Sequence, residues 1–467
     1  MHAPAFHRER EVVVNLHTML LAREAQGRPV TVGVIGAGKF GTMFLAQARP
    51  TRGLHVVGVA DLDVGRARAR LRAAGWDDAA YATPSLGDAF QERRTHLTAD
   101  AEELLAFPDI EVIVEATGVP AVGIRHALGA IAHGKHVVMV TVEADALAGP
   151  LIAAKAQAAG VVYSLAWGDQ PALICEHVDW ARACGFKVVA AGKGTRYEPH
   201  YHDSTPETVW DILDKYLHIE DRASINPKMF NSFIDGSKSA IEMTAVCNAT
   251  GLAPQSGGLA FPPASRFELA DVCKPRADGG TLEGAGVTEV VSSVDRIGRD
   301  VPHHLALGTY VVIEAESDYT RACFREYHML PDRSGRYAAL YRPIHMIGLE
   351  LGVSVASAAL RKEPTGAPNA WRSDVVAVAK RSLRAGEVLD GEGGFCVWGR
   401  QGPAARSLAE GFLPLGLAHN VRLTRDVAAG ASLSYADVAL AADDPALRAR
   451  REMEVAFGRG NAGQFGR

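Results

Sequence analysis

The chain has 467 residues, of which 48% are hydrophobic and 22% are charged, and its formal net charge at pH 7 is −5. A chain of this length divides into two or three domains, and this balance of apolar and charged residues excludes a disordered or fibrous protein. Because the net charge is negative and the basic residues are scattered, the composition argues against nucleic acid as a partner.

The cysteines and the apolar runs indicate the compartment. The six cysteines lie far apart and form no Cys-x-x-Cys pair, which argues against a zinc ribbon or a redox motif and favours reduced thiols. No apolar run approaches the roughly 18 to 20 residues that span a bilayer. The N-terminal residues also lack the charged, apolar and small-residue order of a signal peptide. We therefore expect a cytoplasmic protein with a small-molecule substrate and no membrane partner.

The first predicted element is an amphipathic helix. Its apolar residues recur at helical spacing over residues 8–25, and the pattern ends at Gln26-Gly27. We interpret this helix as a packing arm or a subunit contact, and we expect the protein to form a homo-oligomer.

A series of short apolar runs follows, and stretches of helical periodicity separate them. The run most typical of a buried strand is Val30-Thr31-Val32-Gly33-Val34-Ile35, whose β-branched residues suit a strand covered on both faces. Strands that alternate with helices predict a parallel, doubly wound α/β sheet of the Rossmann type. The expected strands are 30–35, 54–60, 111–116, 136–142 and 161–166, with a helix over 120–133 that Gly134 closes.

Beyond residue 166 the pattern turns mixed. A helix opens at Pro171, where proline suits the first helical position, and Gly185 can end it. Short strand-like runs follow at 186–191 and 310–313, and Thr205-Pro206-Glu207 predicts the start of another helix. This mixture predicts an α+β domain that binds the substrate.

The C-terminal part contains a repeated phrase. After a predicted linker at 363–368, residues 379–389 and 423–433 share a polar start, an apolar residue, Ala-Gly and a polar-apolar ending. The repetition predicts a small β-rich domain built from two related halves. The expected division is therefore an N-terminal helical arm (1–27), a dinucleotide-binding domain (28–166), a catalytic domain (167–370), a β-rich domain (371–445) and a C-terminal tail (446–467).

The clearest chemical motif is the turn Gly36-Ala37-Gly38-Lys39-Phe40-Gly41, between a buried strand and a helix. In the dinucleotide fingerprint, Gly36 permits the tight turn, Gly38 lets the pyrophosphate approach the backbone, and Gly41 allows close contact of helix and strand. The helix N-terminus, which includes Lys39 and Phe40, offers unpaired N–H groups to the anion. The motif predicts a nicotinamide dinucleotide as cofactor.

Residues that follow two other strands refine this prediction. Asp61 ends the second strand 20 residues after Gly41, where a carboxylate accepts hydrogen bonds from the adenosine ribose and repels a 2′-phosphate. NAD is therefore favoured, although Arg66 and Arg68 follow closely and leave NADP as the alternative. The simpler interpretation of Asp61 is the start of a turn. Thr117-Gly118, after the fourth strand, are small enough to lie against the nicotinamide ribose.

Three acids are expected at the carboxyl edge of the sheet, where doubly wound folds bind their ligands. Glu143 and Asp145 follow the fifth strand and could orient substrate, hold a divalent metal or shuttle a proton. A helix-capping role is the alternative, more so for Asp145. Asp169 precedes another helix at the same edge and is either a catalytic acid or simply its N-cap.

Two lysines have glycine neighbours: Lys193 in Ala191-Gly192-Lys193-Gly194, after a strand, and Lys238 in Asp235-Gly236-Ser237-Lys238, followed by Glu242. Such a backbone can hold an ammonium group in a fixed place, where it polarises a carbonyl or protonates an alkoxide. Ordinary surface lysines are the alternative. Glu242 is expected to contact the substrate.

Two further segments carry polar side chains. His200-Tyr201-His202-Asp203 could ligate a divalent ion or place Asp203 against the substrate, although a helix start at Thr205-Pro206 is the simpler interpretation of this stretch. Arg342 could grip a substrate phosphate or carboxylate. Internal packing and ion pairing is the competing interpretation of this segment, which also contains Glu350.

These phrases together resemble a family that pairs a homoserine-dehydrogenase-like nucleotide-binding half with a C-terminal SAF domain. That family includes enzymes called 1-deoxy-D-xylulose 5-phosphate reductoisomerase-like, or DXR-like. The resemblance covers nearly the whole chain after residue 28. It rests on Val34-Ile35-Gly36-Ala37-Gly38, Glu115-Ala116-Thr117-Gly118, Gly134-Lys135-His136-Val137-Val138-Met139, Val142-Glu143-Ala144-Asp145, Ala191-Gly192-Lys193-Gly194, Phe233-Ile234-Asp235-Gly236-Ser237-Lys238, Asn248-Ala249-Thr250-Gly251-Leu252 and Arg342-Pro343.

The resemblance implies NADPH, a divalent metal and the rearrangement and reduction of a phosphorylated ketose. This chain departs from it at Ala60-Asp61-Leu62-Asp63, which replaces a phosphate-tolerant pattern. Homoserine dehydrogenase itself fits worse, because Val142-Glu143 replaces the Asn-Lys pair usual after its fifth strand.

The sequence therefore predicts an NAD(P)-dependent oxidoreductase that transfers a hydride to or from a small polyhydroxylated substrate of sugar type, with or without a phosphate or carboxylate. One alternative is a DXR-like enzyme of isoprenoid precursor synthesis. The other is a protein that binds a nucleotide or a carbohydrate without catalysis, since fold alone does not establish activity.

Overall fold

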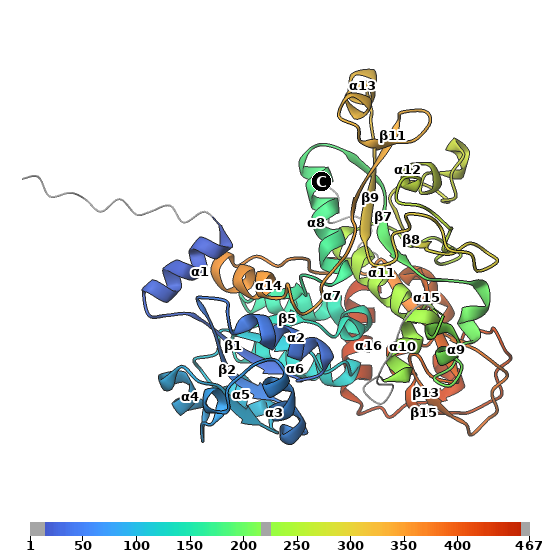
Figure 1. The fold of residues 1–467 in the computed structure, drawn as a ribbon. Helices are drawn as coiled ribbons and strands as arrows, with labels where there is room; N and C mark the ends of the chain where they lie inside the picture. The colour runs from blue at the N-terminus through green and yellow to red at the C-terminus, as the bar shows by residue number, and fades with distance from the viewer. Residues whose placement is uncertain (1–14, 216–225, 459–467) are drawn as a thin grey trace, which may run out of the picture.

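The computed structural model describes residues 15–215 and 226–458 of the chain (Figure 1). The predicted N-terminal helix is α1 (Leu16–Ala25), and the part of that prediction before residue 15 lies outside the described residues. Asn15 caps α1 by accepting a hydrogen bond from the Thr18 amide.

The first domain is built on a six-stranded sheet in the order β3-β2-β1-β4-β5-β6, and all of its strands are parallel. This order is that of the Rossmann dinucleotide-binding fold and confirms the predicted fold class. The additional strand β3 has only three residues, too few for a recognisable apolar run. The strands are β1 (Val30–Ile35), β2 (Leu54–Ala60), β3 (His96–Thr98), β4 (Val112–Glu115), β5 (His136–Met139) and β6 (Tyr163–Leu165).

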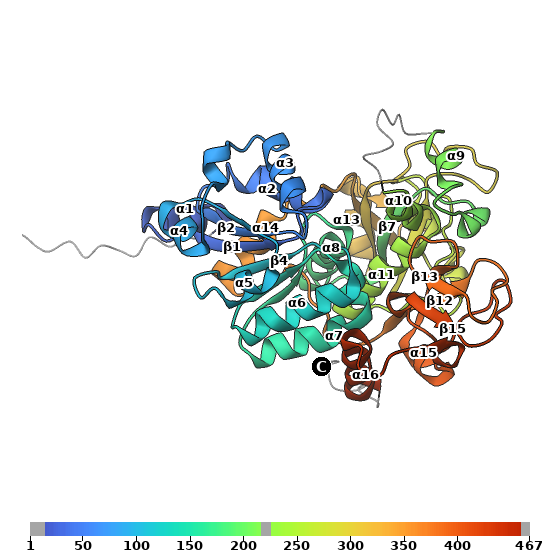
Figure 2. The same cartoon turned by 90° about the horizontal axis from the view of Figure 1, so that it is seen from below.

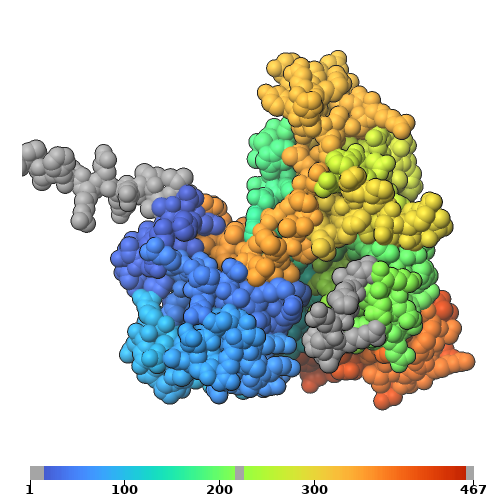
Figure 3. Space-filling model, in the orientation of Figure 1, coloured from blue at the N-terminus to red at the C-terminus, as the bar shows by residue number. Residues whose placement is uncertain are grey.

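Helices cover both faces of this sheet (Figure 2). One face packs against α2 and α3, the other against α5, α6 and α7. The first face is completed by α1 and by α14 (Gly352–Ala356), to which the chain returns after the second domain (Figure 3). α14 therefore packs in the core of the first domain, although it follows the second domain in the chain. The other helices are α2 (Lys39–Ala48), α3 (Val64–Ala73), α4 (Leu86–Glu92), α5 (Ala101–Ala106), α6 (Pro120–Ala132) and α7 (Val142–Ala158).

The second domain has a mixed five-stranded sheet in the order β10-β11-β9-β7-β8. Only β7 and β8 are parallel to each other, and α8 and α11 pack against one face. The expected strands at 186–191 and 310–313 are confirmed as β7 and β9. The elements are α8 (Gln170–Ala183), β7 (Lys187–Thr195), α9 (Val209–Leu213), α10 (Pro227–Ile234), α11 (Ser237–Thr250), α12 (Leu269–Val272), β8 (Val287–Ser292), β9 (Thr309–Glu314), α13 (Asp318–Glu326), β10 (Leu330–Pro331) and β11 (Tyr337–Arg342).

The C-terminal β-rich domain contains two small antiparallel sheets, and the two repeated phrases pair with each other. Leu383 and Val427, which are equivalent in the two phrases, exchange backbone hydrogen bonds of 2.8 and 2.9 Å. The amides of Gly386 and Gly430 each donate 2.8 Å bonds into the other phrase. The two halves are thus related in space as well as in sequence. The elements are β12 (Ser373–Ala379), β13 (Val388–Asp390), β14 (Val397–Pro403), α15 (Ala404–Glu410), β15 (His419–Leu423) and β16 (Val438–Ala439).

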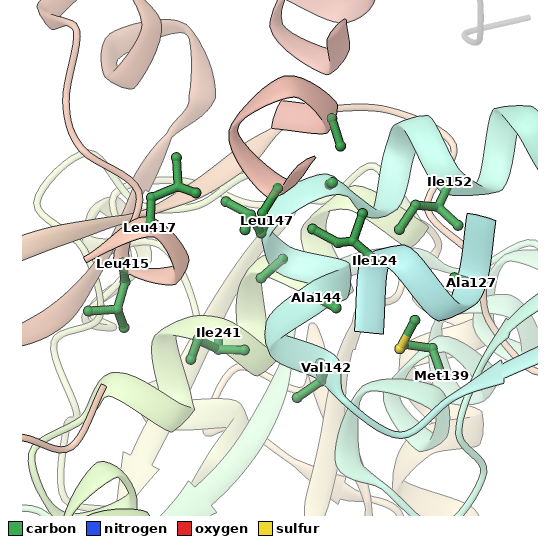
Figure 4. Close-up of a cluster of buried hydrophobic side chains, with 14 of the residues drawn as sticks. Ile124, Ala127, Met139, Val142, Ala144, Leu147, Ile152, Ile241, Leu415 and Leu417 are labelled. Carbon is green, nitrogen blue, oxygen red and sulfur yellow. The ribbon is translucent and has the colours of Figure 1, made fainter. Parts of the chain in front are cut away.

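One hydrophobic core joins all three domains (Figure 4). Leu147 of α7 lies in it together with Ile241 of α11 and with Leu415 and Leu417 of the β-rich domain. All four side chains are at most 6% exposed. The position of each domain is therefore set by packing that it shares with the other two.

The residues assigned to a C-terminal tail begin as helix α16 (Pro445–Gly458), which packs on α6 and α7. Arg450 of α16 is 1% exposed and forms a bidentate ion pair with Asp374, with distances of 2.9 and 2.6 Å. It also bonds Glu454 at 2.9 Å and lies over the Trp371 ring. In the described part of the chain, no helix is long and apolar enough to cross a membrane.

We expect Arg450→Met to lower the free energy of unfolding by about 3 to 5 kcal/mol, because it leaves the buried carboxylate of Asp374 without its cation. The matched change Arg451→Met removes an arginine that is half exposed and pairs with Glu454, and it should cost less than about 1 kcal/mol. Urea denaturation of both variants measures the difference. Equal losses would contradict the structural role given to Arg450.

Candidate functional site

A cavity of about 990 Å³ lies where the three domains meet. It opens at the carboxyl ends of β1, β4 and β5, the edge at which doubly wound sheets bind their ligands. Its walls combine the glycine-rich turn with a group of charged side chains from the other two domains. The residues that matter below are Gly38, Lys39, Phe40, Arg70, Thr117, Gly118, Glu143, Asp169, Lys193, Lys238, Glu242, His345 and Glu392.

The glycine-rich turn has the shape that a dinucleotide requires. Gly36 has φ +98°, and a Cβ there would lie 2.5 Å from the carbonyl oxygen of Ala116. A Cβ on Gly41 would lie 2.1 Å from the oxygen of Gly36, so that only glycine lets α2 approach the strand this closely. Gly38 faces the cavity and begins α2, whose first amides have no partner in the helix. These residues fit a pyrophosphate group.

Asp61 lies beside the turn but does not line the cavity. Its Oδ2 accepts a 2.9 Å hydrogen bond from the Ala37 amide, and its Oδ1 lies 3.3 Å from the Arg66 guanidinium. Arg70 reaches the cavity and donates to the Ala37 carbonyl. Arg70, and not the expected Arg68, accompanies Arg66, because helical spacing places residues 66 and 70 on the same side of α3.

Lys238 and Glu143 form an ion pair across the cavity wall, and each side chain is 12% exposed. Lys238 is in the first turn of α11, after Gly236 with φ +87°, and Glu143 is in the first turn of α7. Burial alone would lower the pKa of Lys238. The surrounding carboxyl groups outweigh burial and raise this pKa well above its usual value; in order of effect they are Glu143, Glu392, Glu242 and Asp169.

Lys193 and Glu242 form a second pair, with side chains 5% and 3% exposed. Lys193 lies inside β7 and not after a strand, which corrects the sequence-based placement. Its glycine neighbours allow the adjoining chain to come close: a Cβ on Gly192 would lie 1.8 Å from the Glu289 oxygen, and one on Gly194 1.6 Å from the Leu305 oxygen. Glu242 is thus tied to Lys193 at the cavity wall.

Asp169 adds a third carboxyl group. Its side chain caps α8 by accepting a 2.8 Å hydrogen bond from the Gln170 amide. Asp169 also lines the cavity, so its position is compatible with an N-cap and with a catalytic acid. Burial and the charge of Glu242 raise the pKa of Asp169 from 3.8 to about 6, against the lowering effects of Lys238 and His345. The carboxyl group therefore titrates close to neutral pH.

Other candidate residues lie away from the cavity. Asp203 is exposed and is not among the lining residues. The Arg342 guanidinium is engaged by Glu350, which matches the ion-pair interpretation. His202 stacks on Trp398 with ring centroids 3.7 Å apart and bonds the Asp235 carbonyl at 2.7 Å. Across residues 15–215 and 226–458, no group of three His, Cys, Asp or Glu side chains is arranged to hold a metal ion.

Asp145 is in the same helix as the cavity-lining residues Glu143 and Ala146, but it is fully buried and does not line the cavity. Its Oδ1 accepts a 2.8 Å hydrogen bond from the Tyr163 hydroxyl. Burial raises the pKa of Asp145 from 3.8 to about 7, and the bond from Tyr163 lowers it only in part.

Sequence reasoning missed Glu392, which reaches the cavity from the β-rich domain. The sequence around it, Gly391-Glu392-Gly393-Gly394, could have identified Glu392 as a candidate. A charged residue with glycine neighbours was the pattern that identified the two lysines. Glu392 is far from the other candidates along the chain, so the sequence does not show that it shares a cavity with them.

Two family models match adjoining parts of the chain. Residues 32–165 match the NAD-binding domain of homoserine dehydrogenase, and residues 168–351 match the catalytic domain of the oxidoreductase DRL. The matched ranges contain the glycine-rich turn and the ion-paired lysines Lys193 and Lys238. None of the curated proteins compared with the chain matches it.

Solved structures resemble the chain only weakly. A probable dehydrogenase from Thermotoga maritima is 12% identical, over 72% of this chain and 90% of its own, with a TM-score of 0.35. A dihydrodipicolinate reductase from Paenisporosarcina is 11% identical over 72% and 97%, with a TM-score of 0.32. A biliverdin reductase from Synechocystis, bound to biliverdin and NADP+, is 20% identical over 36% and 48%, with a TM-score of 0.24. At these TM-scores no conclusion about this chain follows from them.

We expect Asp145→Asn to stabilise the protein increasingly as pH rises from roughly 4 to 7. The raised pKa means that the folded state keeps a proton that the unfolded state has lost, so that wild-type stability falls with rising pH across this range. The full effect is about 4 kcal/mol. Melting temperatures measured against pH test this, with exposed Asp179→Asn as control. A constant difference between variant and wild type would contradict the assignment.

Proposed function

The chain is an NAD(P)-dependent oxidoreductase, and from this premise we propose that it transfers a hydride to or from a carbon of a small polyhydroxylated substrate of sugar type. The observation that carries the proposal is the continuity of the cavity. The same cavity contains the glycine-rich turn and, further along, the two lysines with their carboxyl partners. A dinucleotide bound at the turn therefore has room for a substrate beside its far end.

When bound, the nicotinamide cofactor supplies a hydride to the substrate carbon or accepts one from it. The ammonium groups of Lys193 and Lys238 attract the substrate oxygen and stabilise the negative charge that develops on it during reduction. The carboxylates of Glu143 and Glu242 hold these ammonium groups in place. They also accept hydrogen bonds from sugar hydroxyls. Such a wall suits a substrate with several hydroxyl groups.

Further basic side chains support a substrate that carries a phosphate or a carboxylate. Lys228 and His345 line the cavity outside the two ion pairs. The Lys228 ammonium already donates to the Asp390 carbonyl, and its remaining N–H groups can meet an anion. We therefore include phosphorylated and carboxylated sugars in the proposed substrate class.

We also propose NAD as the preferred cofactor, because the carboxylate of Asp61 stands at the end of β2, where it repels a 2′-phosphate. Arg66 and Arg70 act in the opposite direction. Since Arg66 is neutralised by Asp61 in the structure, the balance favours NAD.

A metal-dependent rearrangement of the DXR-like type does not fit the residues present. Glu143 and Glu242 are neutralised by lysines, and the part of the chain that the structure describes holds no set of three metal-ligating side chains. The proposed reaction accordingly uses no divalent ion.

We expect Lys238→Gln to lower kcat about 10²- to 10³-fold, because it removes the cation that stabilises the developing alkoxide. The dissociation constant for NAD should change less than about twofold, since the glycine-rich turn is untouched. The assay follows the absorbance of reduced nicotinamide over a panel of polyols, sugar acids and their phosphates.

The control is Lys187→Gln, which changes an exposed lysine of the same strand as Lys193, ion-paired with Glu314. It should leave kcat unchanged. Wild-type protein that binds NAD but turns over no member of the panel would overturn the proposed function and favour a sensor. Equal turnover by Lys238→Gln and wild type would remove Lys238 from the mechanism.

We expect Asp61→Ser to raise the ratio of kcat/KM with NADP to kcat/KM with NAD about tenfold, equivalent to about 1.4 kcal/mol. The change removes the repulsive carboxylate and releases Arg66 to meet the 2′-phosphate. Asp77→Ser, at an exposed ion pair with Arg49, is the control and should not alter the ratio. An unchanged ratio in Asp61→Ser would refute the role of Asp61 in cofactor choice.

A further inference from the structure

A loop of the β-rich domain brings Glu392 to the cavity. This loop, residues 390–394, packs against α10 through its backbone: Lys228 donates to the Asp390 carbonyl, and the buried Asn231 amide donates to the Gly393 carbonyl at 2.9 Å. A Cβ on Gly393, which has φ +66°, would lie 2.1 Å from the Lys228 oxygen. The close approach requires glycine, and it fixes where Glu392 stands.

A second attachment ties the same loop to the start of α11. Lys380 of the β-rich domain pairs with Asp235 at 2.7 Å, and their side chains are 2% and 0% exposed. The Lys380 ammonium also donates to the Gly394 carbonyl at 2.8 Å, and the Gly399 amide donates to Ser237 at 2.8 Å. Asp235 and Ser237 flank the turn that leads to Lys238. The loop that carries Glu392 and the helix that carries Lys238 are thus held by the same buried contacts.

The groups that face Glu392 come from each element packed around it. They are Glu143 of α7, Lys238 of α11, Ser232 of α10 and Asp235 at the end of α10. Lys228 and His419 line the same cavity. Burial and the charge of Glu143 raise the pKa of Glu392 to about 8, while Lys238 and the bond from Ser232 act against them. At neutral pH the carboxyl group therefore carries a proton for most of the time.

The charges of the cavity explain why this proton stays. Four carboxyl groups act on Lys238, and two of them are paired with lysines, Glu143 with Lys238 itself and Glu242 with Lys193. Asp169 and Glu392 are left without a cation of their own in the cluster. Asp169 accepts a backbone amide at the start of α8, which favours its charged form. Glu392 is consequently the better proton donor of the two.

We propose that Glu392 is the acid and base of the reaction, exchanging a proton with the substrate oxygen held at Lys238. In the direction of reduction, the reduced nicotinamide gives a hydride to the carbonyl carbon, the carbon–oxygen π electrons move to oxygen, and the Glu392 carboxyl group protonates that oxygen. In oxidation, the Glu392 carboxylate takes the hydroxyl proton as the hydride leaves for oxidised nicotinamide. The inference rests on the proposed function, and it gives the β-rich domain a direct part in catalysis.

Lys238 does not replace Glu392 in this role. A lysine surrounded by carboxylates holds its proton tightly, so that it stabilises the oxygen by charge and gives up a proton slowly. The two residues therefore have separate tasks: Lys238 stabilises the negative oxygen, and Glu392 supplies or removes the proton.

Glu392→Gln tests the proposal, with Glu410→Gln as the matched control because Glu410 is an exposed carboxylate of the same domain. We expect kcat of Glu392→Gln to fall about 10²-fold and the dissociation constant for NAD to stay within about twofold. In wild type, kcat for oxidation should rise, and kcat for reduction should fall, as pH increases through about 8. This dependence of kcat on pH near 8 should be absent from Glu392→Gln. Glu392→Asp should recover part of the activity.

A second readout needs no turnover. In protein without cofactor, labelled at glutamate carboxyl carbons, one NMR resonance should titrate near pH 8 in wild type and in Glu410→Gln, and should be missing from Glu392→Gln. Wild-type turnover with an unchanged kcat and pH profile in Glu392→Gln would overturn the role of Glu392 alone. Absence of turnover in wild type would overturn the proposed function, and the inference with it.

Discussion

The packing of α7 against α11 determines where the reactive groups lie. Leu147 and Ile241 lie in the core that α7 and α11 share (Figure 4). This packing places the first turns of both helices at the cavity, with Glu143 on one and Lys238 on the other. Because Leu415 and Leu417 of the β-rich domain join the same core, a change in this contact would displace all three walls of the site together.

A second constraint follows from burying so many charges in one place. The cluster around Lys238 brings four carboxyl groups together with Lys193, and burial makes an ionised group without a partner costly there. Two carboxyl groups are neutralised by lysines. The other two, Asp169 and Glu392, instead have raised pKa values, of about 6 and about 8. Burial and repulsion between neighbouring carboxyl groups thus turn a structural cluster into groups able to exchange protons near neutral pH.

The sequence predicted the local features well. β-Branched runs located the long parallel strands, and the glycine turn was recognisable because its three glycines have a fixed spacing between a strand and a helix. It did not predict the ion pairs, whose members are 95 and 49 residues apart. It also missed α11, because this helix is buried on nearly every side and shows no apolar stripe. Glu392 was missed for a related reason: its partners come from other domains, and only tertiary packing brings them together.

Cofactor and substrate are proposed to meet in one cavity, with the reacting oxygen at Lys238. A crystal structure of the protein with NAD and a non-reactive polyol or sugar-acid analogue is the decisive measurement. We expect pyrophosphate at Gly38, the nicotinamide ring beside Thr117 and Glu143, and an analogue oxygen within hydrogen-bond distance of the Lys238 ammonium. A nicotinamide ring bound away from both Lys193 and Lys238, with no analogue oxygen near either, would contradict it.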